Sequence, residues 1–520
     1  MILITSANYV NFGLTSEFGH IPPCMLPVQN KRLYEHQHDL IEKLQANLNT
    51  REKVYVSLPD DYEIPLFDEI KLDRLNISVI KISSKISLLS SVKEAIENYA
   101  DDDEPIRILL GDTLFSELPI TLDIYLYGTS EDDYKWDYSD SNNVYSGYFA
   151  FSNKEKLLSA INYVYYNGDR NHFTDIIEKY NLTGVKSTGW LDFGLQNTYY
   201  RSISKFTTQR EFNSLHITKY SVRKYSKDTN KMKAEANWYY SLPSDMKHFA
   251  PAIYDNYTNG YEIEYLYLSS LANMYVYGES SYNTWINIIN ACCEYLTAEY
   301  SHTCTNAESI AKTNNSLFTD KTLSRINKYA KDKSFDLNHT LLLNGKSLPS
   351  VNDIILEMDK HIEKNAVRFT SIMHGDFCFS NTLYDFKSQS VKVIDPRGLS
   401  AECKEITNYG DLRYDVAKLA HSIIGKYDFI MASRFEYSES SKYDIKFNIY
   451  DNDNCRIAKY FLDRMSSLYN ITTDTIYPIM INLFLSMLPL HNDNILRQKA
   501  LLANALRLYS EYKSLWEIYT

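Results

Sequence analysis

The segment His374-Gly375-Asp376-Phe377-Cys378-Phe379-Ser380-Asn381 carries the most informative pattern in this 520-residue sequence. It places a carboxylate and a carboxamide five positions apart in a stretch whose polar end favours a turn. Thr382-Leu383-Tyr384 then begins a predicted strand, and Val391-Lys392-Val393-Ile394 predicts a second strand that ends at Asp395. Two short strands joined by a turn would bring Asp395 beside Asn381. The pattern therefore predicts an oxygen-rich site that suits Mg²⁺.

Asp376 and Asn381 suit the chemistry of phosphoryl transfer. That reaction requires a carboxylate that orients the acceptor hydroxyl, metal ions on the phosphates, and a cation near them. In a tight loop, the spacing lets Asp376 face the acceptor while Asn381 turns toward a metal. A single Asp after an apolar strand is usually a turn or cap residue, but that explanation does not account for the whole pattern. The segment therefore favours phosphoryl transfer over a purely structural role.

Residues 203 to 520 resemble the aminoglycoside phosphotransferase and choline kinase superfamily, which is similar in design to the protein kinases. The resemblance implies that Asp376 is the catalytic base and that His374 supports the catalytic loop. It also implies that Asn381 and Asp395 hold Mg²⁺ and that ATP is the phosphoryl donor.

Two departures from the protein-kinase pattern concern the acceptor. Gly375 occupies the position where protein kinases have an Arg. Asp395 is followed by Pro396-Arg397-Gly398, where protein kinases have Phe-Gly. Both differences favour a small-molecule substrate over a protein substrate.

The nucleotide site of such a kinase needs a strand lysine that pairs with a helix glutamate. Lys224, at the end of a predicted strand, and Glu235, in the helical pattern that follows, are the preferred pair. Lys219 competes for the role of the lysine. No glycine-rich loop is present between residues 201 and 225, so another backbone arrangement must cover the phosphates.

The run from Tyr409 to Leu419 also resembles this superfamily, in which an Asp at the start of a helix braces the catalytic loop. Asp411 or Asp415 could do this by accepting backbone N–H bonds. Acidic residues are common at the start of any helix, so a structural role explains both equally well. Tyr261–Leu266 resembles the segment that links the two lobes, but its alternation is also that of a plain amphipathic strand.

The first 200 residues alternate short β-like runs with helical patterns. Strands are predicted at Ile2–Ile4, Lys53–Val56, Ile77–Ile80 and Ile106–Leu110, and helices near residues 31–47 and 88–100. Such alternation is typical of a parallel sheet with crossover helices.

Several motifs in this part resemble the sugar-phosphate nucleotidyltransferases. They are the strand Met1–Ile4 followed by Pro22–Val28, the strand Ile106–Leu110 that ends in Gly111-Asp112, the strand Val144–Phe151, and Gly189–Gly194 with Tyr199-Tyr200 behind it. The resemblance implies that Asp112 and Asp192 hold Mg²⁺ while a sugar phosphate attacks the α-phosphorus of a nucleoside triphosphate.

The phosphate-binding residues of that family are missing. The family's first loop has several glycines and an Arg, and a Pro-Lys pair follows. This chain has Ser6–Gly13, with Pro23 or Cys24 where the lysine would fall. Without small residues the backbone cannot approach the phosphates, and without cations their charge is not compensated. Lys31 and Arg32 are expected to be helix-surface charges.

The expected architecture is an α/β nucleotidyltransferase-like domain with a Rossmann-like parallel or mixed sheet, followed by a bilobal α+β kinase-like domain. The first domain is placed at residues 1–202. The small β-rich lobe and the helical lobe of the kinase-like domain are placed at 203–280 and 281–520. Beyond residue 281, strands are expected only at 382–385 and 391–395.

Composition narrows the partners. The net charge of −12 disfavours nucleic acid and anionic membranes. Seven cysteines without a CxxC pair favour a reducing, cytoplasmic compartment. The apolar stretch Tyr477–Leu490 is interrupted by Pro478 and Pro489 and is short for a membrane span, so a buried helix is expected there. The expected partners are a nucleotide and a small-molecule substrate.

The leading hypothesis is ATP-dependent phosphorylation of a hydroxyl on a sugar, polyol or amino alcohol, in the synthesis of a capsule or other surface-polysaccharide precursor. A second hypothesis has both halves active, so that the kinase product is coupled to CMP or a related nucleotide. A third is a nucleotide-binding scaffold without turnover. Asp376, Asn381 and Asp395 argue against the scaffold, and the missing glycine-rich loops argue for it. Whether the first domain transfers nucleotides, binds a sugar or nucleotide, or only supports the kinase is left open.

Overall fold

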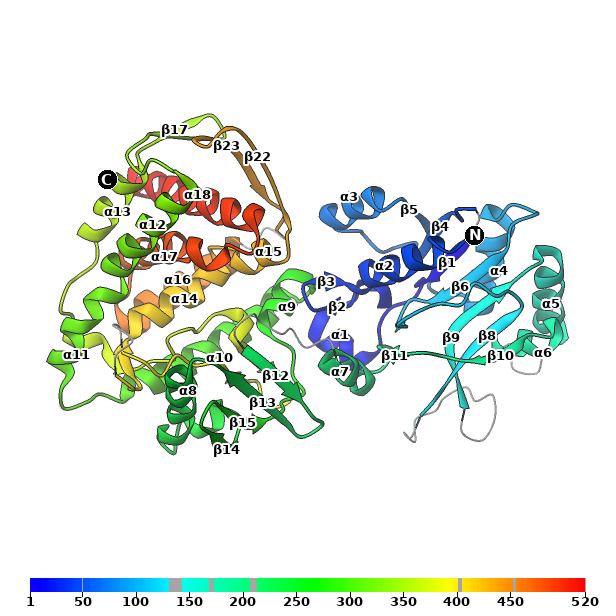
Figure 1. The fold of residues 1–520 in the computed structure, drawn as a ribbon, viewed down its shortest axis with the longest axis horizontal. Coiled ribbons are helices and arrows are strands. Elements are labelled where there is room, and N and C mark those ends of the chain that lie inside the picture. Colours follow the sequence, from blue (N-terminus) through cyan, green and yellow to red (C-terminus); the bar gives the residue numbers. More distant parts are fainter. Residues whose placement is uncertain are drawn as a thin grey trace. The chain divides into compact units, whose positions relative to one another are not determined.

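The computed structural model describes residues 1–519 except Asn49, 131–142, 168–172, 206–212, 401–404 and 452–454. The chain forms two compact units, which are described separately below (Figure 1). The first unit is Met1–Phe206 with Tyr277–Glu279, and the second is Thr207–Val276 with Ser280–Thr520.

The first unit is built on a seven-stranded sheet with the strand order β10-β8-β9-β6-β1-β4-β5. The strands are β1 (Ile2–Thr5), β4 (Val54–Pro59), β5 (Ile77–Ile82), β6 (Ile106–Leu110), β8 (Ile124–Thr129), β9 (Asn143–Phe151) and β10 (Thr183–Lys186). Strands β6, β1, β4 and β5 run parallel, whereas β9 is antiparallel to both β6 and β8. The sheet is therefore mixed, as the predicted fold class allowed.

The helices of the first unit bury apolar residues on one side. They are α1 (Phe12–Phe18), α2 (Leu33–Gln45), α3 (Leu66–Arg74), α4 (Leu88–Tyr99), α5 (Lys154–Asn167), α6 (Ile176–Tyr180) and α7 (Gln196–Lys205). In α4, the Ser87 side chain caps the N-terminus, and Leu89, Val92 and Ile96 recur at the spacing that faces a core. These side chains join Leu3 of the fully buried β1 in one hydrophobic cluster.

The second unit begins with a four-stranded antiparallel sheet in the order β12-β13-β15-β14. The strands are β12 (Asn213–Ile217), β13 (Ser221–Ser226), β14 (Ile253–Tyr257) and β15 (Gly260–Glu264). Helix α8 (Thr229–Ser241) packs on β13, β14 and β15, and Figure 1 shows it beside this sheet. This is the small β-rich part that the sequence predicted.

Helices form most of the rest of the second unit. They are α9 (Leu271–Tyr277), α10 (Tyr282–Ser301), α11 (Ala307–Asn314), α12 (Thr319–Lys333), α13 (Val351–Lys360), α14 (Leu412–Ile423), α15 (Tyr427–Met431), α16 (Cys455–Tyr469), α17 (Thr473–Met487) and α18 (Ile495–Tyr519). Helix α17 packs against α12, α14 and α18. Thr473–His491 has a mean hydropathy of 1.2, high enough for a membrane span, but 72% of it is buried inside the fold. The buried helix expected near residues 477–490 is thus confirmed.

The strand prediction beyond residue 281 was incomplete. The two expected strands are present as β19 (Thr382–Asp385) and β20 (Ser390–Val393), but a further sheet has the order β17-β16-β23-β22. Its strands are β16 (Leu341–Leu343), β17 (Lys346–Leu348), β22 (Phe435–Ser441) and β23 (Asp444–Ile449). Three-residue strands are too short to show a period of two, and β22 is mostly polar, so neither gives a sequence signal. Two more short strands, β18 (Thr370–Ile372) and β21 (Tyr409–Asp411), pair with each other.

Candidate active site

The predicted catalytic loop follows β18, and the β19–β20 hairpin brings Asp395 back to it. Thr382 pairs with Val393 in this hairpin, and the Ile394 N–H donates to the Asn381 carbonyl over 3.0 Å. Asp395 follows directly with a φ of 57°, in the left-handed region that Asp tolerates better than most residues. The pairing therefore places Asp395 next to Asn381, as the two-strand pattern predicted.

Two side chains hold the carboxylate of Asp376. The Lys418 ammonium lies 2.8 Å from Asp376 Oδ1, and the Asn381 amide donates to Asp376 Oδ2 over 3.0 Å. Desolvation acts to raise the pKa of Asp376, but the Lys418 cation outweighs it and holds that pKa well below the usual range. The side chain of Asp376 is 43% exposed, so an ionised and oriented carboxylate is open to solvent.

His374 supports this loop and is not placed to carry a proton. It is fully buried, and burial lowers its pKa to about 4, so the ring is neutral. Nδ1 accepts from the Asp376 N–H at 3.2 Å, and Nε2 therefore carries the hydrogen that is donated to the Ile394 carbonyl at 3.0 Å. His374 thus joins the loop to the strand that leads to Asp395.

Of the two carboxylates that the sequence left open, Asp415 braces the catalytic loop. Its fully buried carboxylate accepts the His374 N–H at 2.6 Å and the Gly375 N–H at 2.9 Å. Asp411 instead caps the N-terminus of α14 and pairs with Arg413 at 2.6 Å. The loop backbone is therefore fixed from one side by a charge-assisted pair of hydrogen bonds.

A second carboxyl group, that of Glu299 on α10, lies buried beside Asp415. Neither Glu299 oxygen has a hydrogen-bond partner among the described residues. Burial and the nearby Asp415 charge raise the pKa of Glu299 well above its usual range. Burial also raises the pKa of Asp415, to about 7, but the two N–H bonds that Asp415 accepts oppose this shift, so the proton of this pair belongs on Glu299.

This pair predicts a pH dependence of stability. A raised carboxyl pKa in the folded state contributes stability that is complete below pH of about 4 and is lost as the pH rises through the folded pKa. Glu299→Gln imitates the protonated group, so we expect its Tm to fall less between pH 5.5 and 8.5 than the wild-type Tm, by about 2–4 °C. Thermal unfolding at both pH values checks this. The control is Glu294→Gln, on the exposed face of the same helix. Parallel Tm curves for wild type and Glu299→Gln would contradict the assignment.

Lys224 connects the small sheet to the catalytic hairpin. Its ammonium lies 2.7 Å from Glu235 on α8 and 3.0 Å from Asp395. Burial acts to lower the pKa of Lys224, but the two carboxylates outweigh it and raise the pKa, so the lysine stays charged. Two buried tyrosines support the cluster: the Tyr261 hydroxyl donates to Glu235 at 2.8 Å, and the Tyr239 hydroxyl accepts from the Asp395 N–H at 3.1 Å.

Lys219 lies elsewhere, in the exposed turn between β12 and β13. Its ammonium stands 4.7 Å from the centre of the Tyr220 ring. The turn from Thr218 to Tyr220 contains no glycine and is closed by the Thr218 N–H, which donates to the Ser221 carbonyl over 2.9 Å. The structure thus brings Lys224, and not Lys219, to Glu235 and Asp395.

Gly398 is a supporting residue whose role the sequence pattern did not indicate. It has a φ of 62°, and an added Cβ would lie 2.1 Å from the Ala234 carbonyl on α8. The backbone after Asp395 therefore packs directly on the helix that carries Glu235, which only a glycine permits.

The donor set fits Mg²⁺. The Asn381 amide nitrogen is used by Asp376, which leaves its carbonyl oxygen available, and the Asp395 side chain is 41% exposed. A carboxylate on a partly exposed side chain, with a carboxamide oxygen next to it, supplies ligands that Mg²⁺ accepts when it keeps several waters. No group of three His, Cys, Asp or Glu side chains in the described ranges is placed to hold a metal ion. An all-protein metal cage is therefore not formed by those residues.

In the first unit, Asp112 and Asp192 come together at the strand pair β7 (Thr113–Leu114) and β11 (Leu191–Asp192). An added Cβ on Gly194 would lie 2.6 Å from Asp112 Oδ2 and 3.6 Å from Asp192 Oδ1, so both carboxyl groups approach one point. Burial, together with the Asp112 charge, raises the pKa of Asp192 to about 7. Burial also raises the pKa of Asp112.

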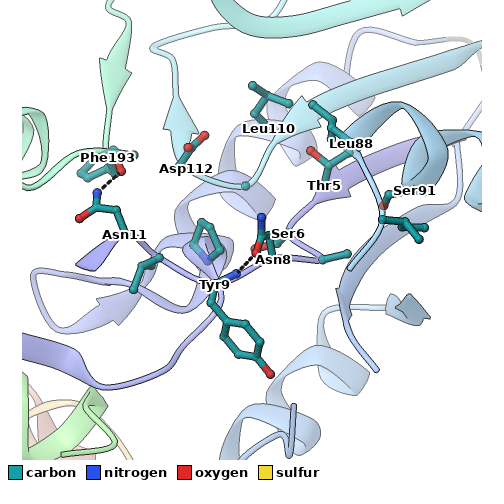
Figure 2. Close-up of a pocket in the computed structure, with 16 residues that line it drawn as sticks. Thr5, Ser6, Asn8, Tyr9, Asn11, Leu88, Ser91, Leu110, Asp112 and Phe193 are labelled. Carbon is teal, nitrogen blue, oxygen red and sulfur yellow. Dashed lines mark hydrogen bonds between the residues drawn. The ribbon is translucent and has the colours of Figure 1, made fainter. Parts of the chain in front are cut away.

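Asp112 borders a cavity of about 340 Å³. Figure 2 shows Asp112 among the residues that line this cavity, together with the loop that carries Ser6, Asn8 and Tyr9. None of the described residues that line this cavity is Lys, Arg or His. Asp192 is not among the lining residues.

The nearest candidate cations in the sequence are engaged elsewhere. Arg32 was expected to be a surface charge, and this was wrong: it is 1% exposed, and its guanidinium pairs with the buried Asp68 at 3.1 Å. Lys31 is exposed as expected and pairs with Asp39 at 2.9 Å. At Cys24, one of the two positions where the family's lysine would fall, the backbone N–H donates to Ser6 Oγ over 3.0 Å. Cations from this region therefore do not compensate phosphate charge in the cavity.

Comparison with known proteins yields structures but no sequence relatives. No family model and no curated protein matches the chain. A structure described as a glucose-1-phosphate thymidylyltransferase of Bacillus anthracis, in complex with sucrose, is 12% identical and has a TM-score of 0.31. The match covers 40% of this chain and 96% of that chain.

Two further matches are kinase structures. An aminoglycoside phosphotransferase APH(2'')-Ib with ADP bound is 12% identical over 58% of this chain and 90% of that chain, with a TM-score of 0.35. A choline kinase from Cryptosporidium parvum Iowa II is 14% identical over 59% of this chain and 87% of that chain, with a TM-score of 0.31. Structures of both predicted kinds are thus found.

Proposed function

We propose that the second unit is a kinase that transfers a phosphoryl group from ATP to a hydroxyl of a small polar metabolite. One observation carries this proposal. Lys224 bridges Glu235 and Asp395, and the hairpin register sets Asp395 beside Asn381, which holds the carboxylate of Asp376. A cation, a metal-ligand pair and a carboxylate that is open to solvent thus form one connected set, as phosphoryl transfer requires.

Asp376 acts on the acceptor. Its carboxylate is ionised at neutral pH because Lys418 lies 2.8 Å away, so it accepts a hydrogen bond from the acceptor hydroxyl and orients the attacking oxygen. The new bond joins that oxygen to the γ-phosphorus, while the bond from the γ-phosphorus to the leaving ADP oxygen breaks. The hydroxyl proton passes to Asp376 and then to solvent.

Lys224 acts on the nucleotide. Fixed between two carboxylates, its ammonium presents a charge to the nucleotide phosphates in a largely buried setting, where electrostatic interactions are strong. Asn381 and Asp395 would hold Mg²⁺, which supplies charge neutralisation on the phosphates when bound. His374 and Asp415 keep the loop in the geometry that aims Asp376.

An acceptor screen tests the proposal. Purified protein with ATP and Mg²⁺ is incubated with sugars, polyols, amino alcohols and their phosphorylated or carboxylated derivatives, and ADP release is measured. We expect release with at least one acceptor, above the rate with water alone. Release that never depends on any acceptor would contradict a kinase. Joined to a nucleotidyltransferase-like unit, such a kinase would suit the synthesis of a surface-polysaccharide precursor.

For the first unit we do not propose nucleotidyl transfer. Asp112 and Asp192 could share a cation, but the described cavity lining offers none of the basic side chains that a triphosphate needs. We therefore expect no pyrophosphate release from nucleoside triphosphates with sugar phosphates and Mg²⁺. Release that disappears in Asp112→Ala would instead show that both halves of the chain are active.

A further inference from the structure

Basic side chains from three parts of the second unit surround Tyr414 on α14. Helix α12 supplies Lys321, whose ammonium donates to the Tyr414 hydroxyl at 2.8 Å and lies 5.0 Å from the centre of its ring. Lys418, one turn further along α14, and Arg397, two residues after Asp395, supply two more charges near the same hydroxyl. We call Lys321, Arg397, Lys418 and Tyr414 the basic cluster.

The basic cluster adjoins the carboxylate that is proposed to receive the acceptor proton. Lys418 lies 2.8 Å from Asp376 Oδ1 and belongs to both groups. The Arg397 N–H donates to the His374 carbonyl at 2.8 Å, and the stem of Arg397 lies against the catalytic loop. An added Cβ on Gly375 would meet Arg397 Cβ at 2.6 Å. Lys418 therefore contacts Asp376 directly, and the stem of Arg397 lies against the same loop, while the Arg397 guanidinium donates to the Ser400 carbonyl over 3.1 Å.

The pKa of Lys321 shifts downward, opposite to the pKa of a lysine that is paired with carboxylates, such as Lys224. Burial, together with the neighbouring Arg397 and Arg325 cations, lowers the pKa of Lys321, although the Tyr414 hydroxyl opposes the shift. Burial acts to raise the pKa of Tyr414, but the Lys321, Lys418 and Arg397 cations outweigh it and lower that pKa to about 8. The lowered pKa of Tyr414 is the effect of these cations, whereas that of Lys321 comes first from burial and then from the neighbouring cations.

We propose that the acceptor is an anion: a hydroxylated metabolite that carries a phosphate or carboxylate group, bound through Lys321 and Arg397 while its free hydroxyl faces Asp376. This inference rests on the proposed kinase function and deepens it. Guanidinium and ammonium groups are the common protein partners of both anions. An amino alcohol or another cationic acceptor would bring a positive charge to the same cations, which is unfavourable.

Matched acceptors test the inference. Hexose phosphates, glycerol phosphate and hydroxy acids are compared with the corresponding hexoses, glycerol and amino alcohols at fixed ATP and Mg²⁺. We expect kcat/KM to be at least about tenfold higher for an anionic acceptor than for its uncharged counterpart. The phosphate and carboxylate arms then distinguish which anion is bound.

Lys321→Gln supplies the second measurement. We expect it to raise the KM of the anionic acceptor about tenfold or more and to leave the KM of ATP unchanged. Lys328→Gln, exposed on the same helix, is the matched control and should change neither value. If an uncharged or cationic acceptor is used as efficiently as the anions, or if Lys321→Gln raises the KM of ATP as much as that of the acceptor, the inference is overturned.

A binding experiment separates failure of the inference from failure of the proposed function. If no acceptor supports ADP release, the kinase proposal fails, and calorimetric titration with glycerol phosphate and hydroxy acids decides the inference alone. Binding of one of these anions that is weakened about tenfold in Lys321→Gln and retained in Lys328→Gln supports it. No binding, or equal binding by both variants, overturns it.

Discussion

Asp376→Asn is expected to lower the acceptor-dependent rate of ADP release by about 10²–10⁴-fold, the usual contribution of a positioned acid or base. Asn has the same size and can keep a hydrogen bond to Asn381, so the loop geometry should persist. It cannot accept the hydroxyl proton, and it removes the charge that Lys418 approaches at 2.8 Å. ADP release under saturating ATP measures the loss.

The unfolding free energy of Asp376→Asn and its binding of nucleotide must be measured alongside its turnover. Lys418 is only 12% exposed, so the loss of its partner should cost about 1–3 kcal/mol of unfolding free energy without unfolding the unit. Asp385→Asn is the matched control, because Asp385 ends β19 and its carboxylate accepts the Lys387 N–H and the Ser388 hydroxyl within the neighbouring turn. Wild-type turnover by Asp376→Asn would show that the catalytic loop is wrongly assigned.

Lys224→Met is expected to lower kcat/KM for ATP by about 10²–10³-fold, because a charge near the phosphates is lost while the side-chain volume is kept. It also leaves Glu235 and Asp395 without the ammonium that separates their charges. Breaking a buried ion pair in this way costs about 3–5 kcal/mol, so a lower Tm is expected as well. Nucleotide titration and steady-state kinetics at varied ATP measure the functional effect.

Lys219→Met is the matched control for Lys224→Met, since both changes remove one lysine from the β12–β13 hairpin. Lys219 lies in an exposed turn against Tyr220, and its loss should change kcat/KM for ATP by less than about twofold. The reverse result, with Lys219→Met inactive and Lys224→Met active, would mean that the nucleotide binds at the other end of the sheet.

The parts of the site that sequence reasoning found are those set by local pattern. His374, Asp376 and Asn381 share one short loop, and the strand that ends at Asp395 is visible as an apolar run. Lys224 and Glu235 lie eleven positions apart on a strand and the next helix, so their pairing also follows from neighbouring elements. Such contacts depend little on how distant segments pack.

The choice between Asp411 and Asp415 shows where the pattern is insufficient. Both carboxylates stand near the start of α14, four positions apart. Asp411 has the extended backbone of an N-cap, with φ −111° and ψ 116°, and therefore turns its side chain to Arg413. Asp415 is one turn inside the helix and faces the loop. Only the packing of α14 against the loop decides between them.

Other partners come from far along the chain and gave no signal. Glu299 lies within α10, where a carboxylate is usually predicted to be a surface residue. Lys321 lies on the strongly polar helix α12, where one more lysine does not stand out. The position of Lys418 could have been inferred from the sequence, because Lys418 follows Asp415 by three positions and so shares a helix face with it. In the first unit, the burial of Arg32 depends on Asp68, which comes from another helix.

The most direct test of the kinase assignment follows the γ-phosphoryl group itself. ATP labelled at the γ-phosphorus is incubated with Mg²⁺, the acceptor panel, and either wild type or Asp376→Asn, and the products are separated. We expect label in a phosphorylated acceptor with wild type and a loss of about 10²–10⁴-fold with Asp376→Asn. Label that appears only as inorganic phosphate with every acceptor, or equal transfer by both proteins, would contradict it.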